Sequence, residues 1–210
     1  MATSSNATPT VFVVDDDESA LAATCYLIES FGLLAKAFSS ARQFLEAYDL
    51  DQPGCLVLDM RMPGTSGLEL QRQLADTGIS LPIIMITGHG DVASCAQAFR
   101  AGAIDFLEKP VSDDVLLVRL KEAISQDAKT RRARQANPQF FARLALLTPR
   151  EREVMELLAQ GRSMKQIAME FGISIQTASK HRIRLLEKLG VANDIELVKL
   201  LMKASVPGPA

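Results

Sequence analysis

Short apolar segments alternate with helix-like segments through the first 125 residues. Strand-like apolar runs lie at 10–14, 33–38, 55–59, 82–87 and 103–107. Apolar residues at helical spacing predict helices at 19–30, 40–48, 66–76 and 91–101, with a fifth helix that begins near Ser112. Short strands that alternate with helices are typical of βαβ units. The pattern therefore predicts an α/β domain with a doubly wound, five-stranded parallel sheet.

The last third of the chain contains only helical patterns, which predict a second, smaller all-α domain. Capping boxes at Thr148–Glu151 and Ser163–Gln166 mark two helix starts. A tight turn at 172–174 leads into a helix at 175–189, and a last helix spans about 193–203. Two helices joined by a short turn that contains glycine are typical of a helix-turn-helix domain.

The change of pattern suggests the boundaries. We expect a disordered tail at 1–9, the α/β domain at 10–125, a linker at 126–142 and the helix-turn-helix domain at 143–210. The helix from Ser112 is expected to enter the linker and to end near Asn137, because Pro138 disfavours helix in the residue before it.

Charge is divided unevenly between the two parts. Residues 1–128 contain 8 Lys/Arg against 18 Asp/Glu, a net charge of −10, and residues 129–210 contain 15 against 7, a net charge of +8. A basic module joined to an acidic one suggests nucleic acid as a partner of the basic module. No apolar run is long enough to span a bilayer, and the start is polar and uncharged, so we expect a cytoplasmic protein with no membrane partner.

Three cysteines, Cys25, Cys55 and Cys95, lie far apart with no CxxC spacing. Their odd number and their spacing argue against a disulfide framework or a zinc site. We expect buried thiols and leave a redox role open.

Polar residues stand at the ends of three predicted strands and just after the fifth strand. Asp15 and Asp16 follow the first strand, Asp59 ends the third, Thr87 ends the fourth, and Lys109 follows the fifth. In open parallel sheets the active crevice lies beyond the carboxyl ends of the strands, so these groups are expected to converge.

Three carboxylates around one point suit Mg2+, which shares its remaining coordination sites with water and phosphate oxygens. Asp59 stands apart from the acidic pair and is the candidate nucleophile, which would form an acyl phosphate. Lys109 would neutralise phosphate charge, and Thr87 would donate a hydrogen bond to a phosphate oxygen.

An alternative is a metal-dependent phosphatase of the haloacid-dehalogenase type. The segment from Asp15 to Ser19 is close to the pattern DxDx[TV] of that class, and Asp15 would then be the nucleophile. Against this alternative, Ser19 stands where Thr or Val is usual, Asp59 would have no role, and the last third of the chain would be unused.

The motifs resemble those of a known family. The segments VVDDDES, LVLDMRMPGTSGLEL, MITGHGD and AGAIDFLEKP together resemble the receiver domain of two-component response regulators. The segment from LTPRE to KLGV resembles the LuxR-type helix-turn-helix domain. Domain order and the phrases RMPG.SG and ITGHGD are similar to the NarL/FixJ type, closest to its FixJ-like branch, and the resemblance covers nearly all of residues 10–203.

The resemblance implies roles for the residues at the strand ends. Asp59 is similar to the phosphoacceptor, with Mg2+ bound by Asp16 directly, by Asp15 directly or through water, by Asp59, and by the main-chain carbonyl of Arg61. Thr87 and Phe106 resemble the switch residues, Lys109 resembles the lysine that pairs with phosphate, and the bond from Lys109 to Pro110 is expected to be cis. Asp17 and Glu18 are expected to be solvated acids in the first turn of a helix.

The exposed side of helix 175–189 is the predicted DNA-binding face. Its residues are polar or basic apart from one isoleucine: Gln176, Thr177, Ser179, Lys180, Ile183, Arg184 and Lys188. Such side chains can contact base edges, a thymine methyl group or phosphates in a major groove. The commonest family version has Thr-Val-Lys-x-His here, whereas this chain has Thr-Ala-Ser-Lys-His at 177–181, so target sequences of relatives do not carry over.

The resemblance thus implies a transcriptional regulator rather than an enzyme, with phosphotransfer only onto its own Asp59. A sensor histidine kinase would phosphorylate Asp59 with Mg2+, and the protein would form a homodimer and bind double-stranded promoter DNA. RNA polymerase is a further candidate partner. An alternative that stays open is a DNA-binding protein that uses the receiver only as a dimerisation module, independent of phosphorylation.

Overall fold

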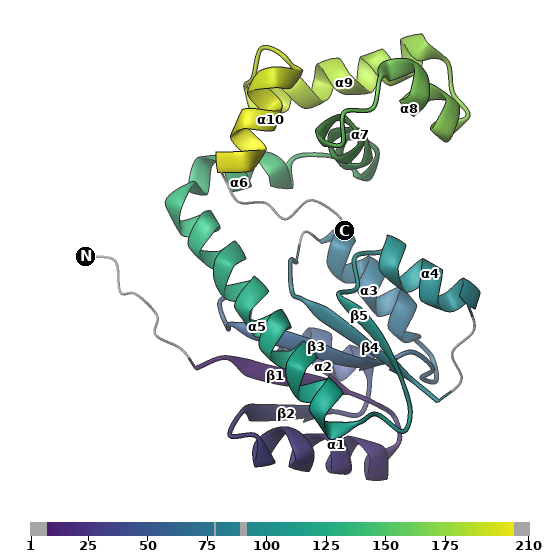
Figure 1. Ribbon diagram of the computed structural model, residues 1–210, viewed down its shortest axis with the longest axis vertical. Helices are drawn as coiled ribbons and strands as arrows, with labels where there is room; N and C mark the ends of the chain where they lie inside the picture. The colour runs from purple at the N-terminus through teal and green to yellow at the C-terminus, as the bar shows by residue number, and fades with distance from the viewer. Residues whose placement is uncertain (1–7, 78, 89–91, 204–210) are drawn as a thin grey trace. The chain divides into compact units, whose positions relative to one another are not determined.

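The computed structural model describes residues 8–77, 79–88 and 92–203, and most of the predicted tail at 1–9 lies outside them. The chain forms two compact units, Met1–Ala128 and Lys129–Ala210 (Figure 1). Each unit has its own hydrophobic core.

The first unit contains a five-stranded parallel sheet with strand order β2-β1-β3-β4-β5. The strands are β1 (Thr10–Val14), β2 (Leu34–Phe38), β3 (Gly54–Asp59), β4 (Ile83–Thr87) and β5 (Asp105–Glu108). The predicted fold class is confirmed. β5 begins two residues later than predicted, because the Ala103 N–H donates to the Ala98 carbonyl and closes the preceding helix.

Helices cover both faces of this sheet (Figure 1). They are α1 (Glu18–Ser30), α2 (Ala41–Ala47), α3 (Gly67–Asp76), α4 (Val92–Arg100) and α5 (Asp113–Ala136). Because successive strand residues point to opposite faces, Val11 and Val13 pack with α1 and α5, whereas Phe12 and Val14 pack with α2, α3 and α4.

The predicted linker at 126–142 is helical for most of its length. α5 continues to Ala136, and a further helix, α6 (Pro138–Ala145), follows after Asn137. α6 was not predicted. Proline at its first position suits a helix start, and Phe140 is buried in the core of the second unit, so tertiary packing supports this short helix.

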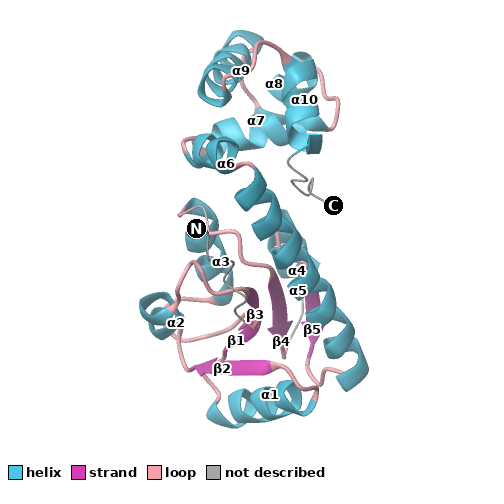
Figure 2. Ribbon diagram, turned by 90° about the vertical axis from the view of Figure 1, so that its left-hand side faces the viewer, coloured by secondary structure: helices cyan, strands magenta, loops and turns pink. Residues whose placement is uncertain are grey.

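The second unit consists of helices in the part that the structure describes (Figure 2). They are α6, α7 (Pro149–Ala159), α8 (Met164–Phe171), α9 (Ile175–Leu189) and α10 (Asp194–Lys203). Both predicted capping boxes are present, at Thr148 with Glu151 and at Ser163 with Gln166. Gly172 has φ of 63°, a left-handed conformation that glycine adopts easily, and it ends α8 at the predicted turn. Among the described residues we find no helix of the length and apolar character needed to cross a bilayer.

Candidate functional site

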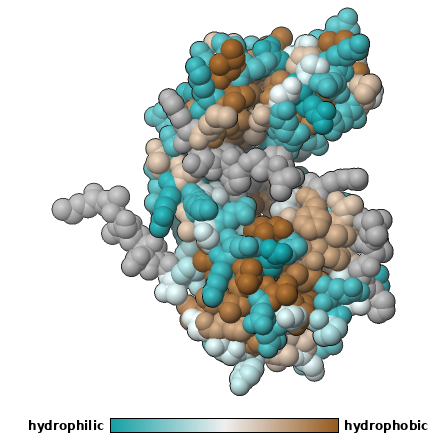
Figure 3. Space-filling view, viewed as in Figure 1, coloured by the Kyte–Doolittle hydropathy of each residue, from teal (hydrophilic) through white to brown (hydrophobic). Residues whose placement is uncertain are grey.

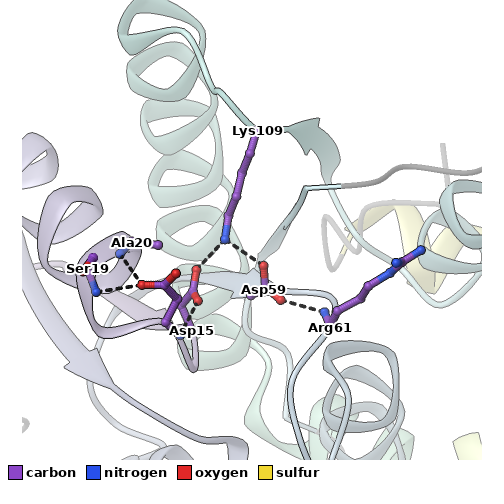
Figure 4. Close-up of polar contacts among 7 residues, drawn as sticks. Asp15, Ser19, Ala20, Asp59, Arg61 and Lys109 are labelled. Carbon is purple, nitrogen blue, oxygen red and sulfur yellow. Dashed lines mark hydrogen bonds and ion pairs between the residues drawn. The ribbon is translucent and has the colours of Figure 1, made fainter.

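Lys109 lies between two buried carboxylates at the carboxyl ends of the strands (Figure 4). Its Nζ is 2.7 Å from Asp15 Oδ2 and 2.9 Å from Asp59 Oδ1. Asp15 follows β1, Asp59 ends β3, and Lys109 follows β5, so the sheet topology brings together residues up to 94 positions apart. The Lys109–Pro110 bond is cis, as predicted.

Asp59 is buried to about the same extent as Asp15. The second oxygen of its carboxylate, Oδ2, accepts a hydrogen bond of 2.7 Å from the Arg61 N–H. Burial raises the pKa of Asp59, and the hydrogen bonds from Lys109 and Arg61 offset only part of this effect. Burial opposes the charge of Lys109 as well, but its hydrogen bonds to the two carboxylates outweigh this and raise the pKa of Lys109.

The run of four acids after β1 divides into different roles. Asp15 is buried, Asp16 is exposed, and Asp17 is the N-cap of α1, accepting hydrogen bonds from the N–H groups of Ser19 at 2.8 Å and Ala20 at 3.1 Å. These hydrogen bonds lower the pKa of Asp17. Asp17 was expected to be only a solvated acid of the first turn, whereas it caps the helix.

The predicted Mg2+ site contains oxygen donors from carboxylates. In residues 8–77, 79–88 and 92–203, no three His, Cys, Asp or Glu side chains form a ready metal-binding group. Asp15 and Asp59 nevertheless converge on one cation, the Lys109 ammonium, and the residue that follows Asp15 in the sequence, Asp16, is an exposed acid. Mg2+ is usually bound by one or two carboxylates, with water and phosphate oxygens as its remaining ligands. The residues therefore fit Mg2+ by their chemistry.

The two predicted switch residues lie on neighbouring strands. Thr87 is the last residue of β4 and is fully buried. Phe106 on β5 is half-buried and packs at the edge of the core formed with α2, α3 and α4.

Gly67, the first residue of α3, lies directly against the backbone of Asp59. A Cβ atom at this position would be 2.3 Å from the Asp59 carbonyl oxygen and 3.0 Å from Met60 Cα. The Gly67 N–H also donates to the Met60 carbonyl at 3.1 Å, which closes the loop that contains Arg61. The sequence pattern gives no sign of this role for Gly67, because the contact depends on how α3 packs.

Comparisons with known proteins agree with both halves of this arrangement. The family model for the response regulator receiver domain matches residues 11–121, and that for the luxR family of bacterial regulatory proteins matches residues 145–201. Transcriptional regulatory protein FixJ of Azorhizobium caulinodans is 39% identical over 93% of this chain and 93% of its own length. The chain belongs to the two-component response regulators. It is a transcriptional regulator with a receiver domain and a LuxR-type DNA-binding domain, so the resemblance seen in the sequence is confirmed.

Other relatives of this response regulator give the same result. Transcriptional regulatory protein TdiR of Thauera aromatica is 37% identical over 97% of this chain and 90% of its own length. A crystal structure of full-length FixJ from B. japonicum is 37% identical with a TM-score of 0.56, and it covers 96% of this chain and 99% of that one. A structure of the response regulator StyR is 43% identical with a TM-score of 0.61, and it covers 94% and 100%. The haloacid-dehalogenase alternative gains no support from these matches.

Most of the predicted DNA-binding face of the response regulator is exposed on α9. The exposed members are Gln176, Thr177, Lys180, Ile183 and Arg184. Ser179 is half-buried, and the Thr177 hydroxyl lies 2.9 Å from the hydroxyl of the N-cap residue, Ser174.

Lys188, which was predicted to belong to the DNA-binding face, forms an ion pair with another residue of the protein. Its Nζ is 2.6 Å from Glu151 Oε2, on the first turn of α7, and 3.0 Å from the Leu146 carbonyl oxygen. The projection of a single helix could not show this contact, because it depends on how α7 packs against α9.

The cysteines show no redox pair. Cys25, Cys55 and Cys95 are all free thiols. Burial raises the pKa of Cys55 to about 12, with a further contribution from the Asp127 carboxylate, so this thiol is unreactive at neutral pH.

Proposed function

We propose that a sensor histidine kinase phosphorylates this response regulator on Asp59 with Mg2+, and that phosphorylation promotes a homodimer that binds promoter DNA. The observation that carries the proposal is the position of the Lys109 ammonium, 2.7 Å from Asp15 and 2.9 Å from Asp59. A buried carboxylate at a strand end, beside a lysine that can pair with a phosphoryl oxygen, is suited to act as a phosphoryl acceptor.

In the proposed reaction an oxygen of the Asp59 carboxylate attacks the phosphorus atom. An acyl phosphate bond forms, the phosphorus–nitrogen bond to the histidine of the kinase breaks, and that nitrogen keeps the electron pair. Lys109 can pair with a transferred phosphoryl oxygen while it stays close to Asp15. The Arg61 N–H holds Asp59 Oδ2, which leaves Oδ1 as the oxygen on the side of Lys109.

Mg2+ would be held by the carboxylates of Asp15, Asp16 and Asp59 and by the main-chain carbonyl of Arg61. The cation would neutralise charge on the phosphoryl oxygens during transfer. Asp15 and Asp59 are already oriented toward one point by Lys109, and Asp16, the next residue after Asp15, is exposed.

Phosphorylation would act on the DNA-binding domain through Thr87 and Phe106. We propose that the phosphate draws both side chains inward and reshapes the face formed by α4 and β5, where two receivers then pair. An apolar side chain is exposed on this part of the receiver: Phe99 on α4 is 46% exposed. Figure 3 shows further apolar side chains at the surface of this unit.

The DNA-binding domain would use the exposed face of α9. The side chains that would enter the major groove are those of Gln176, Thr177, Lys180, Ile183 and Arg184, with Ser179 at the edge of this face. The proposed boundaries are 10–125 for the receiver and 143–210 for the DNA-binding domain, joined by the linker at 126–142. A kinase and a promoter as partners place the regulator in the cytoplasm, where RNA polymerase is a further candidate partner.

Acetyl phosphate with Mg2+ tests the proposal directly. We expect wild-type protein to gain the mass of one phosphoryl group, to dimerise, and to bind a duplex selected from a random library more tightly. Asp59→Asn should gain no phosphoryl group, whereas Asp51→Asn, which changes an exposed acid before β3, should behave as wild type. A phosphorylated Asp59→Asn protein would contradict the acceptor assignment, and DNA binding equal in both states would support the phosphorylation-independent alternative.

A further inference from the structure

The recognition helix α9 is tied to the start of α7 by a buried carboxylate. Glu151 is 3% exposed, and its Oε2 accepts hydrogen bonds from Lys188 Nζ at 2.6 Å and from the Thr148 N–H at 2.9 Å. Lys188 also donates to the Leu146 carbonyl oxygen at 3.0 Å. The last turn of α9 is therefore bound at two points: to Leu146, in the segment between α6 and α7, and to Glu151, in the first turn of α7.

A second contact supports the same end of α9. Arg143 on α6 donates from Nη1 to the Leu189 carbonyl oxygen at 2.9 Å, and a Cβ atom at Gly190 would lie 2.5 Å from that nitrogen. The end of α9 is thus held by residues of α6 and by the capping box of α7, which lies outside the helix-turn-helix itself.

Lys188 belongs by sequence to the series that forms the DNA-binding face. Four residues of this series are spaced four positions apart: Gln176, Lys180, Arg184 and Lys188. Lys188 differs from the others because its ammonium contacts Glu151. Lys188 lies about 12 Å along the helix from Lys180, at a rise of about 1.5 Å per residue. A change in the angle of α9 at Lys188 would displace the exposed side chains, whose contacts with base edges require good hydrogen-bond geometry.

We propose that Lys188 and Glu151 form a positioning pair, which sets the orientation of α9 for base recognition, and that Lys188 does not itself bind DNA. The inference rests on the proposed DNA-binding role of α9. A buried carboxylate without its cation is strongly disfavoured, so removal of Lys188 should shift Glu151 and the end of α9. Removal of both charges should leave the orientation nearly unchanged, because a glutamine can still accept the hydrogen bond from Thr148.

The test compares Lys188→Met with the double variant Glu151→Gln/Lys188→Met in the full-length protein. Each protein is treated with acetyl phosphate and Mg2+ and bound to two duplexes, one selected from a random library by wild-type protein and one scrambled. We expect Lys188→Met to bind the selected duplex at least roughly ten-fold more weakly, as if a base contact were lost, with little change on the scrambled duplex. The double variant should recover to within about three-fold of wild type, since it leaves no buried carboxylate without its cation.

Salt dependence separates this role from a phosphate contact. The slope of log affinity against log salt should equal that of wild type in both variants, whereas loss of one phosphate contact would lower it by about 0.9. Equal losses in the single and double variants with a reduced slope would overturn the proposal. Wild-type affinity in Lys188→Met, or a loss equal on both duplexes, would also overturn it.

Folding is checked by circular dichroism and urea unfolding, with Ser163→Ala as a control that removes a cap on α8. If Lys188→Met does not fold, the double variant alone decides. Wild-type DNA binding by the double variant supports the positioning pair, and weak binding with a reduced salt slope overturns it. If wild-type protein selects no duplex, the proposed DNA-binding function fails instead, and the two failures are thereby distinguished.

Discussion

Gly67→Ala is expected to displace Asp59, the proposed phosphoacceptor, without changing the side chain of Asp59. The new Cβ would lie 2.3 Å from the Asp59 carbonyl oxygen, so the backbones must move apart by about 1.1 Å to reach the shortest ordinary contact distance of 3.4 Å. Overpacking of this kind costs about 1–3 kcal/mol. Helix propensity favours alanine by at most about 1 kcal/mol, so the steric cost should dominate and the variant should be less stable.

A displacement of about 1 Å at a reacting group can reduce a rate by about 100-fold. We therefore expect folded Gly67→Ala to be phosphorylated by acetyl phosphate between about ten-fold and 100-fold more slowly than wild type at saturating Mg2+. The rate is measured by mass spectrometry over time. The matched control is Gly64→Ala in the same loop, where φ is 78° and nothing lies within 4 Å of the added atom. That control carries backbone strain only, so equal rates in the two variants would refute the steric argument.

Three further predictions concern charge. Burial raises the pKa of Asp59 above 3.8, so the folded protein loses stability as pH rises through the raised pKa. In urea unfolding, Asp59→Asn should therefore be more stable than wild type at pH 7 but not at pH 3. Burial tends to raise the pKa of Glu151, but the hydrogen bonds from Lys188 and Thr148 outweigh burial and lower this pKa below 4.5. The stability that Glu151 contributes is therefore full above pH 4.5 and is lost as pH falls through the lowered pKa. Hydrogen exchange of α7 and α9, compared between wild type and Glu151→Gln, measures this difference. Lys180→Ala should cost about 1–3 kcal/mol on the selected duplex and much less on a scrambled one, whereas equal losses with a salt slope reduced by about one would indicate a phosphate contact.

The receiver site could be predicted because its residues stand at strand ends. The sheet places these ends at one edge, so the order of apolar runs is enough to bring Asp15, Asp59 and Lys109 together. Neither distances nor side-chain orientation was needed for that inference. The same argument fails for Gly67, because its importance comes from a contact between α3 and the Asp59 backbone that no periodic pattern encodes.

A helical projection of α9 alone predicts only part of the environment of its side chains. The exposed face of α9 was predicted correctly for Lys180 and Arg184, since a helical projection separates apolar from polar sides. The projection could not show that the flexible side chain of Lys188 turns toward Glu151, a buried acid on another helix. Asp17 shows the same limit on a smaller scale: its acidity was noticed, but its cap depends on the backbone angles of one residue.

The position of Lys109 gives a physical reason for a divalent cation in this response regulator. When all are ionised, Asp15, Asp16 and Asp59 carry three negative charges, and Lys109 provides one positive charge. The acids thus exceed the lysine by two charges before any phosphoryl group arrives, and burial already raises the pKa of Asp59. A phosphoryl group adds further negative charge at the same oxygen, and a single ammonium cannot neutralise both. A lysine variant such as Lys109→Ala should therefore increase the dependence of phosphorylation on Mg2+ concentration, whereas Asp16→Ala should weaken Mg2+ binding and leave the pairing of Lys109 with Asp59 intact.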